Sequence, residues 1–324
     1  GKYLPEKVIT NEDISQHVDT SHEWILDRTG IEQRRIATTE SSLDMAAAAA
    51  EQALQGIDKD SIGLVVVATI TPDNITPSMA AMVKKELGLE RAIAFDINAA
   101  CSGFVYGLWI AESLMNTALS QYSKDGASKR ALVVGTERLT RVTNWEDRET
   151  CILFGDGAGA VAVSAEAGTP FLPATYADGA SGEALTLRGR YGSSPFRSAG
   201  ERNSEPAGSY FMEMDGQAVF KFAVRRVPQV IEEVLEKNGI HKEAISRYIL
   251  HQANRRIVEA VARRLEEPGE KFPMNLQHYG NTSSASIPIL LDELNRSGQL
   301  KKGQKIVLAG FGAGLTWGAT IIEW

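Results

Sequence analysis

The chain has 324 residues and is acidic, with a formal net charge of −7 at pH 7 and a pI near 5.4. This balance argues against general nucleic-acid binding. The sequence has no apolar run of membrane-spanning length and no signal peptide, so it predicts a cytoplasmic protein without a membrane segment. Its first residues, 1–5, look like the continuation of a longer chain.

The spacing of cysteine, histidine and glycine argues against several kinds of site. Two cysteines far apart, Cys101 and Cys151, do not suggest a disulfide framework. The five histidines show no metal-ligand spacing with cysteine or carboxylate, so we expect no metal. No phosphate-binding loop is present, and Gly155-Asp-Gly-Ala-Gly159 lacks the spacing of a dinucleotide fingerprint.

Hydrophobic periodicity and capping residues predict alternating helices and strands in the first part of the chain. Ser41 and Ser42, for example, can cap a strong apolar helix. We expect helices at residues 11–17, 21–27, 43–54 and 78–87, and strands at residues 64–68 and 92–97.

An internal repeat then relates the two halves of the chain. Gly56-Ile-Asp-Lys-Asp-Ser-Ile62 is echoed by Gly239-Ile-His-Lys-Glu-Ala-Ile245, and both follow a helix and precede an apolar strand. Further matches in the same order argue for two copies of one α/β unit. They pair Arg130-Ala-Leu-Val-Val-Gly135 with Lys305-Ile-Val-Leu-Ala-Gly310, and Gly157-Ala-Gly-Ala-Val-Ala-Val163 with Thr316-Trp-Gly-Ala-Thr-Ile-Ile322.

Two stacked copies predict an α/β fold with mostly parallel sheets in a layered α-β-α-β-α body. The expected organisation is a first half over residues 1–169, a connecting excursion over 170–215 and a second half over 216–324. The excursion is rich in Gly, Ser, Ala and Pro, which is typical either of a variable surface loop or of the wall of a site.

Cys101 stands where the apolar strand at 92–97 meets a helix over 102–118 that is apolar nearly all round. The sequence therefore predicts that this helix is buried. The positive end of a helix lowers the pKa of a thiol, and its N–H groups can hold an oxyanion. Cys101 is thus a candidate nucleophile, the alternative being a structural core cysteine.

Three more stretches fall at predicted strand ends, where α/β sheets place ligands. His251 follows the strand at 248–250 and precedes a helix, which favours a neutral imidazole that can donate from Nε2; a structural histidine is the alternative. Asn281 precedes an apolar helix over 287–294 and could instead be a turn or cap residue. The glycines of 310–318 allow close approach to a ligand, or form a tight hairpin.

The repeat brings these stretches together. Asn281 stands at a strand–helix junction that matches that of Cys101 in the other copy. Two such junctions facing each other across a pseudo-twofold axis predict a single pocket with Cys101, His251 and Asn281.

Seven motifs along the chain are specific enough to suggest a family. They are Asp19-Thr-Ser-His-Glu-Trp24, Arg28-Thr-Gly-Ile-Glu-Gln-Arg-Arg35, Asn98-Ala-Ala-Cys-Ser-Gly-Phe104, Phe154-Gly-Asp-Gly-Ala-Gly159, His251-Gln-Ala-Asn254, Gly280-Asn-Thr-Ser-Ser-Ala-Ser286 and Gly310-Phe-Gly-Ala-Gly314. With these motifs, over essentially its whole length, the chain resembles the β-ketoacyl-[acyl carrier protein] synthase III enzymes of the thiolase superfamily, lacking only their first strand. The resemblance implies the superfamily's fold of two pseudo-symmetric halves and a catalytic triad of Cys101, His251 and Asn281.

The resemblance also implies binding residues. Trp24 and Arg148 would sandwich the adenine of coenzyme A, Arg28 would contact its phosphates, and Asn254 would line the site. Further implied roles are an oxyanion hole at Cys101 and Ala313, where the family usually has glycine at the second position, an acyl pocket at Thr76, Leu108 and Phe311, and carrier-protein docking at Lys221, Arg255 and Arg256.

The implied assembly is a homodimer in which the sheet strand after residues 103–108 is shared across a twofold axis. The loop over 73–78 would close the partner's acyl pocket. Acetyl-selective relatives carry phenylalanine where this chain has Thr76, so the resemblance implies room for longer acyl chains. The alternative is that Met79 or Leu108 fills the space and acetyl remains the preferred primer.

The implied function is the initiating condensation of type II fatty-acid synthesis, in which an acyl-coenzyme A primer and malonyl-acyl carrier protein give β-ketoacyl-acyl carrier protein. Acyl-coenzyme A is then a substrate, and no cofactor is expected. The glycine loop 310–314 lacks the second cysteine of a degradative thiolase, and Asn281 stands where elongating synthases have histidine. A Cys-His-Asn synthase or acyltransferase of secondary metabolism, and a non-catalytic acyl-binding scaffold, remain as alternatives.

Overall fold

Two mixed β-sheets form the centre of the computed structural model, which describes residues 1–119, 130–164, 171–189 and 210–324. In the first sheet, β4 runs parallel to both of its neighbours, β5 and β6, whereas β7 is antiparallel to β6 and to β1. The strand order is β1 (Lys2–Tyr3), β7 (Asp156–Ser164), β6 (Arg130–Arg138), β4 (Ile62–Ala68) and β5 (Ile93–Ile97).

The second sheet repeats the core of this arrangement. Its β11 is parallel to β12, whereas β13 is antiparallel to β12 and to β8. The order is β11 (Ile245–Leu250), β12 (Lys305–Gly312), β13 (Thr316–Glu323) and β8 (Ala174–Ala177). The expectation of mostly parallel sheets is therefore wrong. The connection at 313–315 is too short for a crossover helix, so β13 must fold back beside β12.

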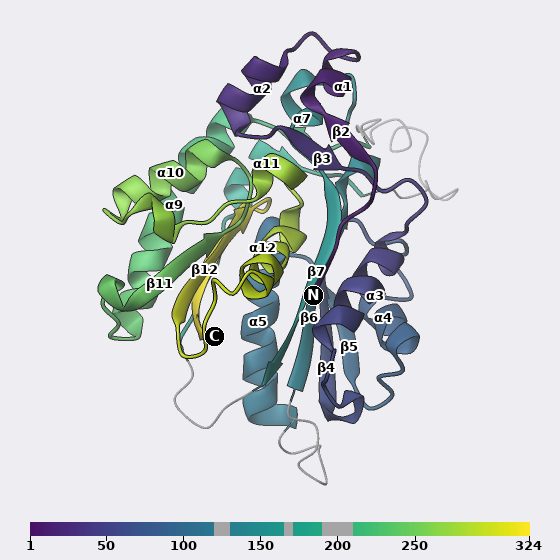
Figure 1. Ribbon diagram of the computed structural model, residues 1–324, viewed down its shortest axis with the longest axis vertical. Helices are drawn as coiled ribbons and strands as arrows, with labels where there is room; N and C mark the ends of the chain where they lie inside the picture. Colours follow the sequence, from purple (N-terminus) through teal and green to yellow (C-terminus); the bar gives the residue numbers. More distant parts are fainter. Residues whose placement is uncertain (120–129, 165–170, 190–209) are drawn as a thin grey trace, which may run out of the picture.

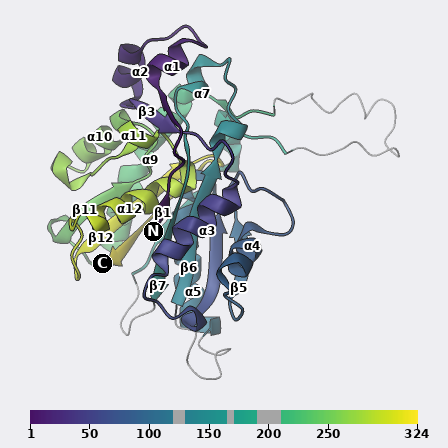
Figure 2. The same ribbon diagram turned by 45° about the vertical axis from the view of Figure 1, so that its right-hand side comes forward.

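Helices cover the sheets in three layers, which completes the expected α-β-α-β-α arrangement (Figures 1 and 2). Apolar side chains of α3 and α4 pack on the outer face of the first sheet, and those of α5 and α12 fill the space between the sheets. Side chains of α9 and α10 cover the outer face of the second sheet. The helices are α3 (Ser42–Ala53), α4 (Met79–Leu87), α5 (Gly103–Leu114), α12 (Ser286–Arg296), α9 (Gly216–Lys237) and α10 (Arg255–Arg264).

Side-chain caps begin most of the predicted helices. Ser41 accepts a hydrogen bond from the Asp44 N–H at the start of α3, and Ser78 caps α4 in the same way. The remaining elements are β2 (Val8–Thr10), α1 (Asn11–Ser15), α2 (His22–Thr29), β3 (Gln33–Arg35), η1 (Lys59–Ser61), η2 (Ala100–Ser102), a π-helical turn (Met115–Leu119), η4 (Leu139–Arg141), α7 (Arg148–Cys151), η5 (Gly179–Ala184), β9 (Leu185–Thr186), β10 (Glu213–Met214), η6 (Lys242–Ala244), η7 (Gly269–Lys271), α11 (Leu276–Tyr279) and η8 (Ser283–Ala285).

The two halves match in topology, as the repeat predicts. β4, β6 and β7 of the first sheet correspond to β11, β12 and β13 of the second, and the helices α5 and α12 each follow a short 3-10 turn. One expectation differs: Asn281 follows the short helix α11 and not a strand. The boundaries at 169 and 215 stay a prediction. Part of the 170–215 excursion, residues 170 and 190–209, lies outside the described residues, and β8 joins the second sheet.

The central helix α5 is not buried all round, because the first sheet ends beside it. Trp109 of α5 is 39% exposed, and Ile93 of the edge strand β5 is 48% exposed. β6, the strand that follows α5, lies inside its sheet between β7 and β4. β6 therefore offers no edge to a second subunit, contrary to the expectation that the strand after 103–108 is shared. Across the described ranges, no helix combines the length and apolar character needed to cross a bilayer.

Candidate active site

Cys101, His251 and Asn281 line a single cavity of about 600 Å³. Each comes from a different chain segment: Cys101 from η2, His251 from the residue after β11, and Asn281 from the segment before η8. Phe311 and Ala313, at the end of β12, line the same cavity. The structure thus brings together the residues that the repeat predicted to share a pocket.

Cys101 packs tightly against Gly312 at the end of β12. A Cβ atom built on Gly312 would lie 2.8 Å from the Cys101 Cβ and 3.0 Å from its Sγ, so only glycine fits at 312 without a shift. Burial raises the pKa of the Cys101 thiol to about 12, although a hydrogen bond with the Ser283 hydroxyl acts in the opposite direction. Burial therefore acts against the lowering of the pKa that is expected from the helix terminus.

His251 is buried and neutral. Burial lowers the pKa of its imidazole to about 3, so the ring carries a single N–H. Its Nδ1 lies 2.7 Å from the Ser286 Oγ, and the ring meets the edge of Phe311 with centroids 5.2 Å apart. The neutral state is the expected one, but its cause is burial.

Asn281 is held by its backbone and by one side-chain oxygen. Its N–H donates to the Leu153 carbonyl (2.8 Å), and its carbonyl accepts from the Gly155 N–H (3.0 Å). The side-chain Oδ1 accepts from the Ser283 N–H at 2.8 Å. Asn281 is thus a turn residue, as the structural alternative predicted. Its side-chain amide N–H groups remain available on the cavity side.

The opposite end of the cavity is lined by Trp24, Arg28 and Asn254. The guanidinium of Arg148 lies 4.6 Å from the Trp24 ring centroid, and that of Arg28 lies 5.6 Å from it. Asn254 caps α10 through its Oδ1 and donates its Nδ2–H to the Arg28 carbonyl at 3.0 Å. The four residues that the resemblance assigned to coenzyme A therefore lie together.

The three candidate docking residues sit on the adjacent helices α9 and α10 but differ in surroundings. Arg256 is exposed, lines the cavity and lies over the Phe220 ring, at 5.8 Å. Arg255 donates to the Leu26 carbonyl (3.2 Å) and is thus partly engaged within the chain. Lys221 is exposed and lies outside the cavity.

Two expected acyl-pocket residues, Leu108 and Thr76, do not line this cavity. Leu108 packs instead in the apolar core between the two sheets. Thr76 lies in the exposed tip of the loop after β4.

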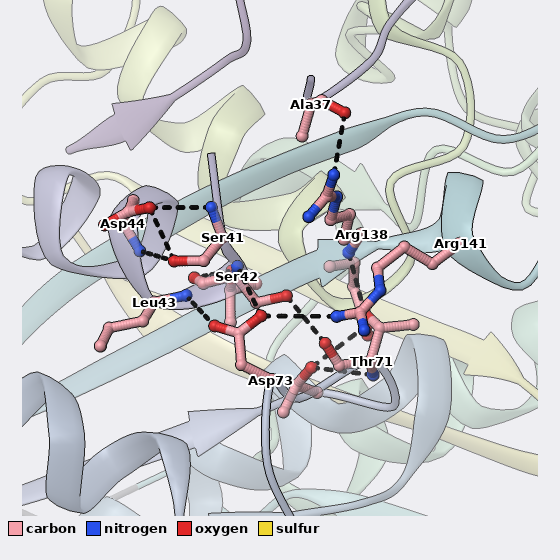
Figure 3. Close-up of polar contacts among 12 residues, drawn as sticks. Ala37, Ser41, Ser42, Leu43, Asp44, Thr71, Asp73, Arg138 and Arg141 are labelled. Atoms are coloured by element: carbon pink, nitrogen blue, oxygen red, sulfur yellow. Dashed lines mark hydrogen bonds and ion pairs between the residues drawn. The ribbon is translucent and has the colours of Figure 1, made fainter. Parts of the chain in front are cut away.

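The base of that loop is anchored, as Figure 3 shows. Asp73 accepts from the N–H groups of Ser42 (3.1 Å) and Leu43 (2.8 Å) and pairs with Arg141 at 3.5 Å. The Ser42 hydroxyl donates to the Thr71 carbonyl at 2.8 Å. These hydrogen bonds hold Thr71 and Asp73 at the start of the loop, so the part of the loop that carries Thr76 begins from a fixed position.

A further group next to the site was missed from the sequence. Glu137, near the end of β6, is fully buried and accepts hydrogen bonds from Ser283 and Ser284 of η8, the turn that follows Asn281. A carboxylate two residues after the apolar run 131–135 was the available signal. Within the described ranges, no group of three or more His, Cys, Asp or Glu side chains is placed to hold a metal ion.

Known proteins share this sequence and architecture. Residues 95–180 match the family described as 3-Oxoacyl-[acyl-carrier-protein (ACP)] synthase III, and residues 235–324 match its C-terminal family. The beta-ketoacyl-[acyl-carrier-protein] synthase III of Streptococcus equi subsp. equi is 47% identical, with 99% of this chain and 96% of that protein covered. The corresponding protein of Clostridium perfringens is 44% identical, with 100% and 97% covered.

Solved structures agree. The crystal structure of 3-oxoacyl-[acyl-carrier-protein] synthase III from Aquifex aeolicus superposes with a TM-score of 0.89 at 42% identity, covering 100% of this chain and 98% of that one. The priming β-ketosynthase from the R1128 polyketide pathway gives 0.88 at 35% identity, with 100% and 94% covered. With its Cys-His-Asn cavity between two thiolase-like halves, the chain belongs to the 3-oxoacyl-[acyl-carrier-protein] synthase III family of condensing acyltransferases.

Proposed function

We propose that this cavity joins an acyl-coenzyme A primer to malonyl-acyl carrier protein, releasing coenzyme A and carbon dioxide. The observation that carries the proposal is the convergence of Cys101, His251 and Asn281 in one cavity whose other end is lined by Trp24 and Arg28. A nucleophile and two hydrogen-bond donors lie at one end, and cationic and aromatic groups suited to a nucleotide lie at the other.

In the first half-reaction, the Cys101 sulfur attacks the thioester carbonyl of the primer. The backbone N–H groups of Cys101 and Ala313 stabilise the oxyanion, and coenzyme A leaves. The tight contact of Gly312 with Cys101 supports this assignment, because it holds the peptide between Gly312 and Ala313 close to the nucleophile. Loss of one such donor costs about 3–4 kcal/mol in the transition state.

In the second half-reaction, His251 and Asn281 donate hydrogen bonds to the thioester carbonyl of the malonyl group. A neutral imidazole donates from Nε2 only when Nδ1 is an acceptor. The Ser286 O–H, which donates to the Ser283 carbonyl at 2.8 Å, therefore has to turn to Nδ1 in this step. Loss of carbon dioxide forms an enolate that both donors stabilise. Its carbon then attacks the acyl group on Cys101. These steps use only side chains and substrates, so a reaction without cofactor or metal is part of the proposal.

The same proposal includes a homodimer. β5 is an edge strand whose only strand neighbour in the described chain is β4, and Ile93 and Trp109 expose apolar surface there. Pairing of this edge with a second copy would cover both side chains. The loop tip beside it carries Ile75, which is 80% exposed, together with Thr76. A role of Thr76 in primer length and a cytoplasmic location stay predictions.

The decisive experiment separates the two half-reactions. Cys101→Ala should abolish transfer of a radiolabelled acyl group from acyl-coenzyme A, whereas Asn281→Ala should become acylated and fail to form β-ketoacyl product. If the Asn281 variant could not be acylated, the division of roles would be wrong. A panel of acyl-coenzyme A primers would distinguish fatty-acid initiation from the related priming synthases of specialised metabolism, of which the R1128 enzyme is a solved example.

A further inference from the structure

Arg34 of β3 is a fully buried cation with no carboxylate at ion-pair distance in the described chain. Its side chain is 0% exposed, and it donates to three neutral oxygens: the Asn11 Oδ1 (2.9 Å), the Ile152 carbonyl (2.6 Å) and the Ile9 carbonyl (3.4 Å). Its Nε has no hydrogen-bond partner. Burial of a cation without a counter-ion costs folding free energy, so stability alone does not account for this residue.

On one side, the guanidinium holds the segment 152–155, which pairs with Asn281. The Leu153 carbonyl accepts from the Asn281 N–H (2.8 Å), and the Gly155 N–H donates to the Asn281 carbonyl (3.0 Å). A Cβ atom built on Gly155 would lie 3.2 Å from the Arg34 Cβ, so the stem of the arginine also packs against this segment. Arg34 therefore fixes the backbone of Asn281 through its strand-like partner.

On the other side, the guanidinium leads to the nucleotide end of the cavity. Asn11 is also fully buried, and its Nδ2–H donates to the Ile31 carbonyl at 2.7 Å. The Ile31 N–H in turn donates to the hydroxyl of Thr29, the last residue of α2, at 2.9 Å. α2 carries Trp24 and Arg28, and Thr29 itself lines the cavity. A chain of buried hydrogen bonds thus runs from α2 to the segment that holds the asparagine of the site.

These hydrogen bonds do not reach the nucleophile. Cys101 comes from η2 and packs against Gly312 of β12. Neither element accepts a hydrogen bond from Arg34 in the described chain. Loss of the cation should therefore affect the Asn281 side of the cavity more than the Cys101 side.

We propose that Arg34 is a positioning residue that holds Asn281 at a fixed position relative to α2, so that the geometry of condensation depends on the nucleotide end of the cavity. This inference rests on the proposed function, in which Asn281 acts only in condensation. Arg34 lies behind Ile152, which lines the cavity, and does not line it itself. A displacement of about 1 Å in a positioned group can cost about 100-fold in rate, so a residue behind the wall affects the reaction through the donor that it holds.

The two half-reactions test the proposal when they are measured separately in Arg34→Met, which removes every donor and keeps most of the side-chain length. Condensation by pre-acylated enzyme should slow about 10–100-fold at saturating malonyl-acyl carrier protein, whereas the maximum rate of single-turnover acylation should stay within about threefold of wild type. An equal loss in both half-reactions would indicate a general structural role and overturn the proposal. An unchanged condensation rate would also overturn it.

Arg35→Met is the matched control. Arg35 is the next residue of β3, and its guanidinium donates to the carbonyls of Pro5 and Glu6 instead of to the segment beside Asn281. Both rates should stay within about twofold of wild type in this variant. A condensation defect as large as that of Arg34→Met would show that any lost arginine of β3 has this effect, and would overturn the specific role of Arg34.

A double-mutant cycle tests the connection to α2. Asn11→Ala breaks the chain of hydrogen bonds on the α2 side and leaves the contact between Arg34 and Ile152 in place. It should slow condensation about tenfold, and the double variant should be no slower than Arg34→Met alone, because both changes break the same chain. Additive effects, or a normal condensation rate in Asn11→Ala, would overturn the proposal.

Denaturant unfolding establishes that each variant is folded under the assay conditions. If Arg34→Met does not fold, Arg34→Lys takes its place, because an ammonium keeps the charge but lacks the planar fork that reaches two acceptors. Normal condensation by Arg34→Lys would then overturn the proposal, and slow condensation with normal acylation would support it. Failure of the wild type to form acyl-Cys101 would instead overturn the proposed function.

Discussion

Ala100 and Ser283 occupy the same place in the two halves of the molecule. Each has a positive φ, 44° and 48°, and each stands in a 3-10 turn that leads into a central helix. Each is held by an asparagine two residues earlier: Asn98 accepts from the Ala100 N–H (3.3 Å), and Asn281 accepts from the Ser283 N–H (2.8 Å). Asn98 is therefore the residue of the first half that corresponds to Asn281 in the second. The same turn geometry presents a nucleophile in one half and a hydrogen-bond donor in the other.

Gly312→Ala should disable the nucleophile. The added Cβ would lie 3.0 Å or less from the Cys101 side chain, so either Cys101 or β12 must move. We expect about 1–3 kcal/mol lower unfolding free energy and at least a 100-fold loss of acylation rate. Chemical denaturation and single-turnover acylation measure the two effects. Gly269→Ala, where the new Cβ meets nothing within 4 Å, is the control; normal acylation by Gly312→Ala would contradict the argument.

Ser286→Ala should impair condensation more than acylation. The Ser286 hydroxyl is the partner of the His251 Nδ1 and also donates to the Ser283 carbonyl at 2.8 Å. When this hydroxyl turns to Nδ1, it fixes the tautomer that can donate from Nε2. Its removal should lower the condensation rate by about 10–100-fold, the effect of one lost buried hydrogen bond. Rates of the two half-reactions are compared in the same variant, with Ser286→Thr expected to restore most activity. An equal loss in both half-reactions would count against the tautomer role.

Lys221→Glu should weaken the use of malonyl-acyl carrier protein and leave primer loading unchanged. Lys221 is exposed and outside the cavity, whereas Arg256 lines the cavity and could affect both substrates. Reversing a charge at the rim of a docking surface for an acidic partner should raise the KM for that partner about tenfold, less at high salt. Arg264→Glu, in the last turn of α10, is the control. Slower primer loading by Lys221→Glu would argue against a docking role.

Ile93→Lys should dissociate the proposed dimer. Ile93 projects from the edge strand β5, and a lysine there would place a charge in the covered interface. Sedimentation at low micromolar concentration should show a dimer for the wild type and a monomer for the variant. Leu172→Lys, which changes an apolar residue of similar exposure (54%) elsewhere, should remain dimeric. A wild-type monomer with full activity would refute the proposed assembly.

Glu137 should make the stability of the wild type depend on pH. Its folded-state pKa is about 7, above the ordinary 4.5, so between these values the folded protein holds a proton that the unfolded chain has lost. The contribution of this group is therefore fully present below pH 4.5 and decreases as the pH rises to about 7, by about 3 kcal/mol. The free energies of unfolding of wild type and Glu137→Gln are measured with denaturant across this window. As the pH rises, the wild type should lose stability relative to the variant. A constant difference would contradict the shifted pKa.

Local features of the fold could be predicted from the sequence because neighbouring residues encode them. Ser41 accepts the N–H that begins α3, as the sequence predicted, and Ser21, Ser78 and Asn254 cap other helices in the same way. The repeat likewise predicted two equivalent sheets, and it placed Cys101, His251 and Asn281 in one cavity.

The tertiary structure alone decided the direction of the strands, the contacts of Leu108 and the protonation of the site. Strand direction depends on which strands become neighbours, and the short connection between β12 and β13 forces them antiparallel. The pKa of Cys101 depends on desolvation by segments far apart in the chain, which acts against the local helix terminus. Glu137 lies beside Ser283 only because β6 and η8 meet, across 146 positions of sequence. Caps act through adjacent peptides, whereas burial and dielectric act through packing between distant segments.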